Sequence, residues 1–364
     1  MTPLSSRGIF PDVDDIKVRV DDALKKYLQG VSINGLELTL LHGDASARRY
    51  VRIRGGALKK SLVAMVLAPE QARFSEEVMK GPAPPELPFI NLQRYLAGIG
   101  IRVPEILHVD ESLGVVLLED LGNITLEQEI AQHGEDAVGA LYARAIDVLV
   151  GLQAATSKHP NPNCLAYTRT FDFDLMRWEL DHFREYVVEI DRQVQFSVSE
   201  RSEVDAAFAG IARELSSLPR VFVHRDFQSR NLMVVSEGLA LIDFQDALRG
   251  PVMYDLVALL RDSYVVLPPH QLDELIDRYL SSCLRVELPR AEKAEFRRHV
   301  DLQTVQRKLK DAGRFVFIDR VKHNPSFLPY IPASLAYVRE ALNRLPELSR
   351  LQDILGKAVP ELAR

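Results

Sequence analysis

The residues best suited to chemistry lie in two short segments of the second half of the chain. The first is HRDFQSRN at 224–231, in which Asn231 follows Asp226 by five residues, and the second is IDFQD at 242–246, which contains Asp243. Each segment follows a short apolar, strand-like run. Phosphoryl transfer needs one carboxylate that takes the proton of an attacking hydroxyl, and an amide oxygen and a second carboxylate that hold Mg²⁺. The spacing therefore predicts Asp226 as the catalytic base and Asn231 and Asp243 as the metal ligands.

A second interpretation treats these residues as turn-forming polar side chains that cap two strands. Under the catalytic interpretation, the first segment leaves its strand and exposes His224, Arg225 and Asp226. The three residues HRD alone would favour neither interpretation over the other. Asn231 follows Asp226 at the spacing of a kinase-like catalytic loop, and Asp243 stands at the end of the following strand. Both observations favour the catalytic interpretation.

The elements that must position these groups divide into a strand-rich first part and a helical second part. Apolar residues at helical spacing predict a first helix over 14–29, and another helix follows the proline-rich connector at 81–88. Short apolar runs separated by turn residues predict five strands before residue 122, the first three of them antiparallel. After residue 124 the pattern is mostly helical, with strand-like runs at 221–224 and 239–244. We therefore expect an N-terminal lobe over 1–121, a C-terminal lobe over 122–364, and the chemistry between them.

Composition narrows the class of protein. The 364 residues carry 45 Lys and Arg against 51 Asp and Glu, a net charge of −6, which argues against a nucleic-acid partner. No apolar run approaches the length needed to span a bilayer, and the first residues lack the pattern of a secretory signal. Two cysteines, Cys164 and Cys283, form no disulfide framework or cysteine-rich metal site, so a cytoplasmic protein is the simplest expectation.

Several motifs together resemble a known group of enzymes. They are GDASARRY at 43–50, LLEDLG at 117–122, HRDFQSRNLM at 224–233, DFQDALRGP at 243–251, YDLVALLRDSY at 254–264 and DLQTVQRKLKDAG at 301–313. This series resembles the aminoglycoside-phosphotransferase superfamily, and within it the bacterial cell-wall amino-sugar kinases, from about residue 36 to 345. The resemblance implies an α+β fold of two protein-kinase-like lobes, ATP and Mg²⁺ as cofactors, and transfer of phosphate to the anomeric hydroxyl of an N-acetylated amino sugar in cell-wall recycling. It also implies that Asp255 props the catalytic loop, although a plain helix N-terminal carboxylate is the competing interpretation.

The resemblance also assigns the nucleotide-binding residues. Backbone N–H groups around Gly43, Ala45 and Ser46 would cradle the phosphates, where the alternative is an ordinary hairpin tip. The backbone of Glu119 and Leu121 would contact adenine, where the alternative is a solvated turn at Glu119 and Asp120.

One feature of kinases is missing. Met65 stands where kinases carry a lysine on the third strand, and the helix after 88 contains no partner Glu. Arg48 and Arg49 are the expected substitutes, since arginine binds phosphate in a bidentate manner. Arg49 is in register with Val51 and Ile53 on an alternating strand, so we expect it to face the cleft. Arg230, beside Asn231, is a further candidate in the catalytic loop, and each arginine could equally be a solvated surface charge.

Fewer residues in the sequence point to the site that binds the phosphate acceptor. A helix is expected over 171–189, with Met176, Leu180 and Phe183 on its buried face and with Trp178 and Glu179 as a possible wall for the substrate. Residues 301–364 carry eleven Lys and Arg against seven Asp and Glu, which suits a neutral or anionic sugar better than a polycation. The rivals are a kinase for an aminoglycoside, a choline-like alcohol or a hydroxy amino acid, and a nucleotide-binding pseudokinase.

Overall fold

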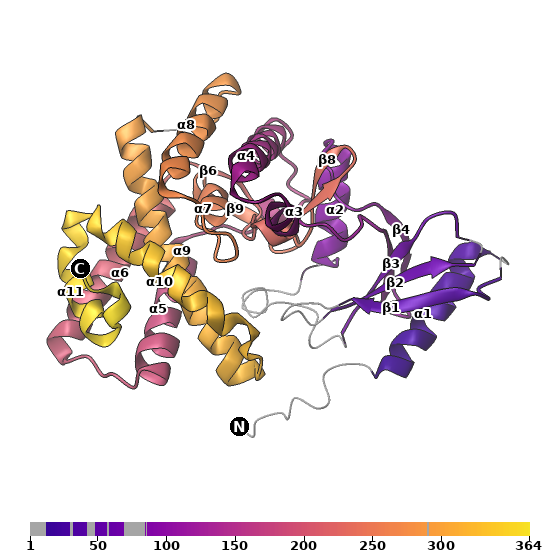
Figure 1. Ribbon diagram of the computed structural model, residues 1–364, viewed down its shortest axis with the longest axis horizontal. Helices are drawn as coiled ribbons and strands as arrows, with labels where there is room; N and C mark the ends of the chain where they lie inside the picture. Colours follow the sequence, from indigo (N-terminus) through magenta and orange to yellow (C-terminus); the bar gives the residue numbers. More distant parts are fainter. Residues whose placement is uncertain are drawn as a thin grey trace. The chain divides into compact units, whose positions relative to one another are not determined.

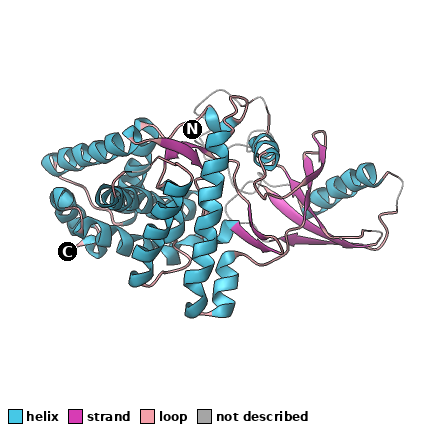
Figure 2. Ribbon diagram, turned by 90° about the horizontal axis from the view of Figure 1, so that it is seen from above, coloured by secondary structure: helices cyan, strands magenta, loops and turns pink. Residues whose placement is uncertain are grey.

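The computed structural model describes residues 12–29, 32–41, 48–56, 58–68, 84, 86–289 and 291–364. The chain forms two compact units, one made of residues up to Ala97 together with Val103–Gly122, and the other of Gly98–Arg102 together with Asn123–Arg364. A five-stranded sheet dominates the first unit, whereas the second is largely helical (Figure 2). The predicted α+β fold is therefore confirmed.

The first unit is built on an antiparallel sheet with the strand order β1-β2-β3-β5-β4. Its strands are β1 (Leu36–Leu41), β2 (Arg49–Gly55), β3 (Leu62–Val66), β4 (Ile106–Asp110) and β5 (Val115–Glu119), and its helices are α1 (Val13–Leu28) and α2 (Pro88–Gly98). All five predicted strands and both predicted helices are present, with ends that differ by a few residues.

Helix α1 covers one face of this sheet (Figure 1). Its apolar residues Ile16, Val20 and Leu24 recur every four positions and form a buried stripe. They pack in one cluster with Val51 and Ile53 of β2 and with alternate residues of β3 and β5. Because strand side chains alternate between faces, Tyr50, Arg52 and Arg54 of β2 point to the face opposite α1.

The second unit consists mainly of helices. These are α3 (Leu126–His133), α4 (Glu135–Lys158), α5 (Phe173–Phe183), α6 (Val198–Ser217), α7 (Tyr254–Leu260), α8 (Pro269–Arg285), α9 (Lys293–Lys322), α10 (Ile331–Asn343) and α11 (Ser349–Ala358). A π-helical segment, η5 (Arg184–Asp191), continues α5, and short 3₁₀ turns lie at η4 (Leu165–Tyr167), η6 (Ser229–Asn231), η7 (Pro325–Tyr330), η8 (Pro346–Leu348) and η9 (Pro360–Leu362).

Four short strands form two hairpin-like pairs in the second unit. Strand β6 (Arg220–Val223) pairs with β9 (Leu248–Pro251), and β7 (Leu232–Val235) pairs with β8 (Gly238–Leu241). Strands β6 and β8 were predicted, but β7 and β9 were not. Strand β9 contains a glycine and a proline, which are depleted in strands, so its pairing with β6 depends on tertiary contacts.

One helical segment in the described part of the chain, Ala137–Lys158 of α4, is long and apolar enough to cross a membrane. Within the structure 56% of that window is buried, as in the core helix of a folded unit. Length and composition are therefore weak grounds for a membrane span here.

Candidate active site

The loop that leaves β6 is held in place by a buried carboxylate. Asp255, at the start of α7, accepts hydrogen bonds from the backbone N–H groups of His224 (2.7 Å) and Arg225 (3.0 Å). Burial raises the pKa of Asp255 to about 7, although the two N–H donors act in the opposite direction. This is the propping contact that we expected of Asp255.

The prediction that His224 and Arg225 are exposed is wrong. His224 has no exposed surface, and Arg225 is buried with its guanidinium 3.1 Å from Glu179 of α5. The other Glu179 oxygen accepts a hydrogen bond from Gln306 of α9 (2.7 Å). Glu179 is itself completely buried. It therefore supports the loop through Arg225 and does not form a wall for the substrate.

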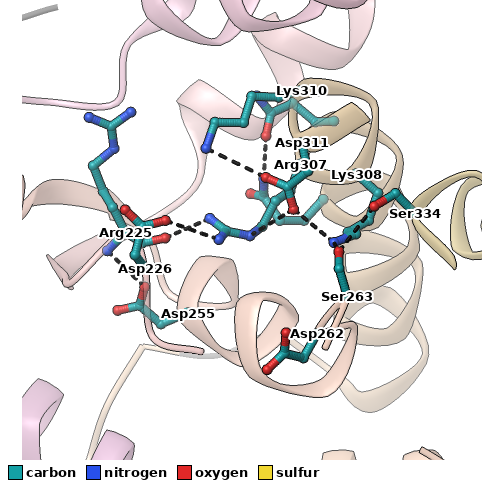
Figure 3. A network of polar contacts seen from close by, with 12 residues as sticks. Arg225, Asp226, Asp255, Asp262, Ser263, Arg307, Lys308, Lys310, Asp311 and Ser334 are labelled. Atoms are coloured by element: carbon teal, nitrogen blue, oxygen red, sulfur yellow. Dashed lines mark hydrogen bonds and ion pairs between the residues drawn. The ribbon is translucent and has the colours of Figure 1, made fainter. Parts of the chain in front are cut away.

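The loop presents Asp226 next to a cation. The Asp226 side chain is 36% exposed, and its Oδ1 lies 3.4 Å from the guanidinium of Arg307 on α9 (Figure 3). Arg307 also donates a 2.6 Å hydrogen bond to the backbone carbonyl of Arg225. Burial acts to raise the pKa of Asp226, but the positive charges of Lys310 and Arg307 outweigh it and lower the pKa. Asp226 is therefore ionised at neutral pH and can accept a hydrogen bond from a hydroxyl.

Asn231 and Asp243 are brought together by a hairpin. The β7–β8 pairing continues through a hydrogen bond from the Ile242 N–H to the Asn231 carbonyl (3.1 Å), so Asp243 follows directly. The Asn231 side chain donates to the Asp226 carbonyl (2.8 Å), which ties the three residues into one group. Asp243 has a left-handed backbone (φ 64°) and accepts a 2.7 Å hydrogen bond from Gln245.

The chemistry of this donor set fits magnesium. An amide oxygen and a carboxylate are hard ligands, and Mg²⁺ commonly uses one or two carboxylates together with substrate phosphates. Among the described residues, no group of three or more His, Cys, Asp or Glu side chains is arranged to hold a metal ion.

Arg230 has several partners within its own unit. It forms a bidentate ion pair with Glu127 of α3 (2.7 and 3.0 Å) and donates to the Tyr330 hydroxyl (2.8 Å). Its guanidinium also stacks 3.6 Å from the centre of the Tyr264 ring. These contacts hold the loop between α3 and η7, and a phosphate-binding role for Arg230 stays a prediction.

Sequence reasoning missed a buried polar network behind the loop. The Ser229 N–H and hydroxyl both donate to Asp262 (2.8 and 2.6 Å), which follows α7. Nearby, Lys308 of α9 donates to Ser263 (2.5 Å) and Asp311 (2.8 Å). The signal was available in DLQTVQRKLKDAG, where Arg307, Lys308 and Asp311 interrupt the apolar positions of a core helix. The motif contributed to the resemblance, but its residues were given no role.

The predicted phosphate loop is only partly described. Gly43, Ala45 and Ser46 lie outside the described residues. Arg49 begins β2 and is in register with Val66 of β3. Its face of the sheet is the one that α1 covers at Val51. Arg49 therefore shares the side of the sheet on which α1 packs, and phosphate binding by Arg48 or Arg49 stays a prediction.

The opposite face of the sheet carries a buried cation that sequence reasoning overlooked. Met65 is buried opposite Tyr50, and Arg52 is the next residue of β2 on the same face. Arg52 forms a buried ion pair with Asp120 (2.8 Å) and donates to the Gly122 carbonyl (2.6 Å). A solvated turn is therefore the wrong interpretation at Asp120.

The segment after β5 contains the predicted adenine-contacting residues. The Glu119 N–H donates to the Glu105 carbonyl (2.9 Å), and the Glu119 side chain accepts from the Glu105 N–H (3.2 Å). Leu121 is half-buried. Adenine binding by Glu119 and Leu121 stays a prediction.

Comparison with known families decides the class of protein. A sequence model of the phosphotransferase enzyme family matches residues 37–294. The chain belongs to the phosphotransferase enzyme family. This match covers both units and includes Asp226, Asn231 and Asp243, so the prediction of a phosphotransferase is confirmed.

Individual phosphotransferases are similar to this chain over nearly its whole length. A relative from Neisseria meningitidis serogroup B, named N-acetylmuramate/N-acetylglucosamine kinase, is 34% identical over 92% of this chain and 95% of its own length. A Pseudomonas aeruginosa relative with the same name is 33% identical over 88% of each chain.

Solved structures of other phosphotransferases confirm the two-lobe kinase-like fold. Choline kinase from Cryptosporidium parvum Iowa II superposes with a TM-score of 0.63 at 13% identity, over 93% of this chain and 98% of its own. Amicoumacin kinase in complex with AMP-PNP, Ca²⁺ and Ami gives a TM-score of 0.55 at 13% identity, over 92% and 96% of the two chains.

Proposed function

We propose that this phosphotransferase transfers the γ-phosphoryl group of ATP to the anomeric hydroxyl of N-acetylmuramate or N-acetylglucosamine. The observation that carries the proposal is the 34% identity, across almost the entire chain, to a relative named for these two sugars. The use of ATP is further supported by a structural neighbour solved with the ATP analogue AMP-PNP.

The proposed reaction uses groups of the two loops that follow β6 and β8. Asp226 accepts the hydrogen bond of the sugar hydroxyl, orients its oxygen toward the γ-phosphorus and takes the proton as the new O–P bond forms and the bond to ADP breaks. Asn231 and Asp243 would hold Mg²⁺, which when bound neutralises charge on the phosphates. Because nearby positive charges lower its pKa, Asp226 is ionised before the transfer and can accept the hydroxyl proton.

The remaining predicted residues would bind the nucleotide. We assign the backbone around Gly43, Ala45 and Ser46 to the phosphates and the backbone of Glu119 and Leu121 to adenine. For the missing third-strand lysine we keep Arg48, Arg49 and Arg230 as candidates, with Arg230 weakened by its pairing to Glu127.

The test is ³¹P NMR of the product formed from each sugar with ATP and Mg²⁺. We expect a phosphate resonance coupled to the anomeric proton, together with stoichiometric ADP. Phosphate on any other hydroxyl would overturn the proposed position. The absence of turnover with both sugars would overturn the proposed acceptor class.

A further inference from the structure

Helix α9 carries a line of cations that begins at the catalytic carboxylate. Arg307, Lys310 and Arg314 are separated by three and four residues, so they share one face of the helix, and Phe317 continues the line. Arg307 is the member that reaches Asp226. The proposed chemistry uses Asp226, but nothing so far accounts for the cations beyond Arg307.

Lys310 is a partly exposed cation of this line, and its ammonium has donors available for a ligand. Only 15% of its side chain is exposed, and its ammonium lies 3.5 Å from Asp311, beyond a good hydrogen bond. Lys308 binds the other Asp311 oxygen at 2.8 Å, and Arg307 approaches the same carboxylate at 3.9 Å. Three cations therefore share this one carboxylate.

The side chain of Lys310 is also directed toward the reacting group. Figure 3 shows it extending from α9 toward the loop that carries Arg225 and Asp226. The positive charge of Lys310 is the largest electrostatic influence on Asp226 from another side chain. A substrate whose hydroxyl contacts Asp226 would therefore bring its neighbouring substituents close to Lys310.

Aromatic rings border the far end of the same line. The Trp178 ring centre lies 5.2 Å from that of His182, which in turn lies 5.3 Å from Phe317. The guanidinium of Arg314 stacks on Phe317 at 4.7 Å. Trp178 is only half-buried. Half-buried aromatic rings next to a few fixed polar groups are typical of small-molecule sites.

Gly313 allows these two sets of residues to meet. A Cβ at Gly313 would lie 2.8 Å from the Phe183 backbone nitrogen, so α9 and the end of α5 cross in direct backbone contact. The crossing places Phe317 beside the ring of His182, and Arg314 stacks on Phe317. The cationic line and the aromatic rings are therefore adjacent.

We propose that Lys310 is the specificity-determining residue for the acceptor and binds the carboxylate that distinguishes N-acetylmuramate from N-acetylglucosamine. This inference rests on the proposed function. The lactyl carboxylate is the one full charge on either sugar, and an ammonium that is mostly removed from water forms a strong, charge-assisted contact with it. Arg314 extends the same positive field toward the aromatic rings.

The experiment compares three acceptors with the wild type and Lys310→Met. The acceptors are N-acetylmuramate, its methyl ester, which keeps the lactyl group without the charge, and N-acetylglucosamine. We expect Lys310→Met to lower the ratio of kcat/KM for N-acetylmuramate to that for the ester by about ten- to a hundredfold, the effect of one charge-assisted contact. The loss should appear in KM for the acid, because the contact exists before and during transfer.

Two further variants complete the design. Lys310→Arg keeps the charge and should retain the preference for the acid, whereas Lys310→Gln should lose it, so a folding defect in one variant leaves the test intact. Lys293→Met removes an exposed lysine at the start of α9, paired with Asp277, and serves as the matched control.

The outcomes separate this inference from the proposed function. Turnover of the sugars with an unchanged acid-to-ester ratio in Lys310→Met would overturn the role of Lys310 and leave the proposed function standing. An equal loss with all three acceptors, or a rise in KM for ATP alone, would assign Lys310 to the phosphates and overturn the inference. No turnover of either sugar by the wild type would overturn both.

Discussion

At the residue scale, the charges and the backbone geometry around Asp226 position the carboxylate that we propose as the catalytic base. Arg225, which precedes it, and Asp243 both adopt left-handed backbone conformations, with φ of 76° and 64°. Residues other than glycine rarely adopt this conformation, and it costs on the order of 1–3 kcal/mol unless the surroundings enforce it. Here the buried Arg225–Glu179 ion pair and the hydrogen bond from Gln245 to Asp243 hold the two residues. The strain is consistent with side chains that are positioned for a reaction.

Replacing the base tests its assignment directly. Asp226→Asn keeps the size of the side chain and removes the proton acceptor, so we expect kcat to fall by ~10²–10⁴-fold, with ATP binding preserved. Steady-state kinetics and a thermal-shift titration with ATP and Mg²⁺ measure the two effects. A variant that keeps more than about a third of the wild-type kcat would contradict the role of Asp226.

The metal assignment predicts a loss of magnesium-dependent nucleotide binding. Asp243→Ala should abolish the thermal shift that MgATP produces, because a ligand that binds only the native state stabilises it in proportion to its affinity. Asp246→Ala, three residues further along the same loop, is the matched control and should keep the shift. An unchanged shift in Asp243→Ala would transfer the metal to another residue.

At the element scale, the loop after β6 is positioned by three helices that are distant in sequence. Helix α7 supplies Asp255, α5 supplies Glu179, and α9 supplies Arg307. Asp255 contacts the backbone of His224 and Arg225, Glu179 contacts the Arg225 side chain, and Arg307 binds the Arg225 carbonyl and also lies 3.4 Å from Asp226 Oδ1. The loop is therefore fixed from its buried side, and 36% of the Asp226 side chain remains exposed.

The anchor at Asp255 predicts a stability effect. Asp255→Ala leaves two buried N–H groups without an acceptor, at ~1–3 kcal/mol each, so we expect a loss of roughly 2–6 kcal/mol in the free energy of unfolding. Asp255→Asn keeps a carbonyl oxygen and should lose less. Urea denaturation measures both variants. Equal stability of Asp255→Ala and the wild type would show that the anchor is dispensable.

At the scale of the whole molecule, the second unit buries an unusual number of ionisable groups, and their pKa values link folding to pH. Burial lowers the pKa of His224 to about 4, so the folded protein keeps this ring neutral. In the unfolded chain it takes up a proton near pH 6.5. The contribution of His224 to stability is therefore complete above about pH 6.5 and is lost as the pH falls toward 4. Asp255, with its raised pKa, acts in the opposite direction and loses its contribution as the pH rises through about 7.

This linkage predicts a change of slope in one variant. Between pH 6.5 and 5, His224→Asn should lose less stability than the wild type, by up to about 1.4 kcal/mol per pH unit. His270→Asn, at an exposed position on α8, is the control and should follow the wild type. Thermal denaturation across this range measures how stability changes with pH. Parallel curves for His224→Asn and the wild type would show that His224 does not link stability to pH.

The sequence alone determined those features that depend on neighbouring residues. The period of two in β2 and β3 and the period of four in α1 reflect local geometry, which hardly depends on the rest of the chain. Asn231 and Asp243 could be grouped with Asp226 because a short hairpin, itself local, carries all three. Their types and spacing were therefore enough to predict a phosphotransferase.

Only the tertiary structure decided the features that depend on which surfaces become covered. Alternation predicts that Arg49 and Val51 share a face, but only the packing of α1 decides that this face is the covered one. His224 and Arg225 follow a strand, as exposed loop residues often do. In the structure they are buried, and they are held by Asp255 and Glu179, which lie 30 and 46 positions from Arg225. Arg307 lies 81 positions from Asp226. Burial and charge pairing over such separations are set by how helices pack, and no local pattern in the sequence encodes them.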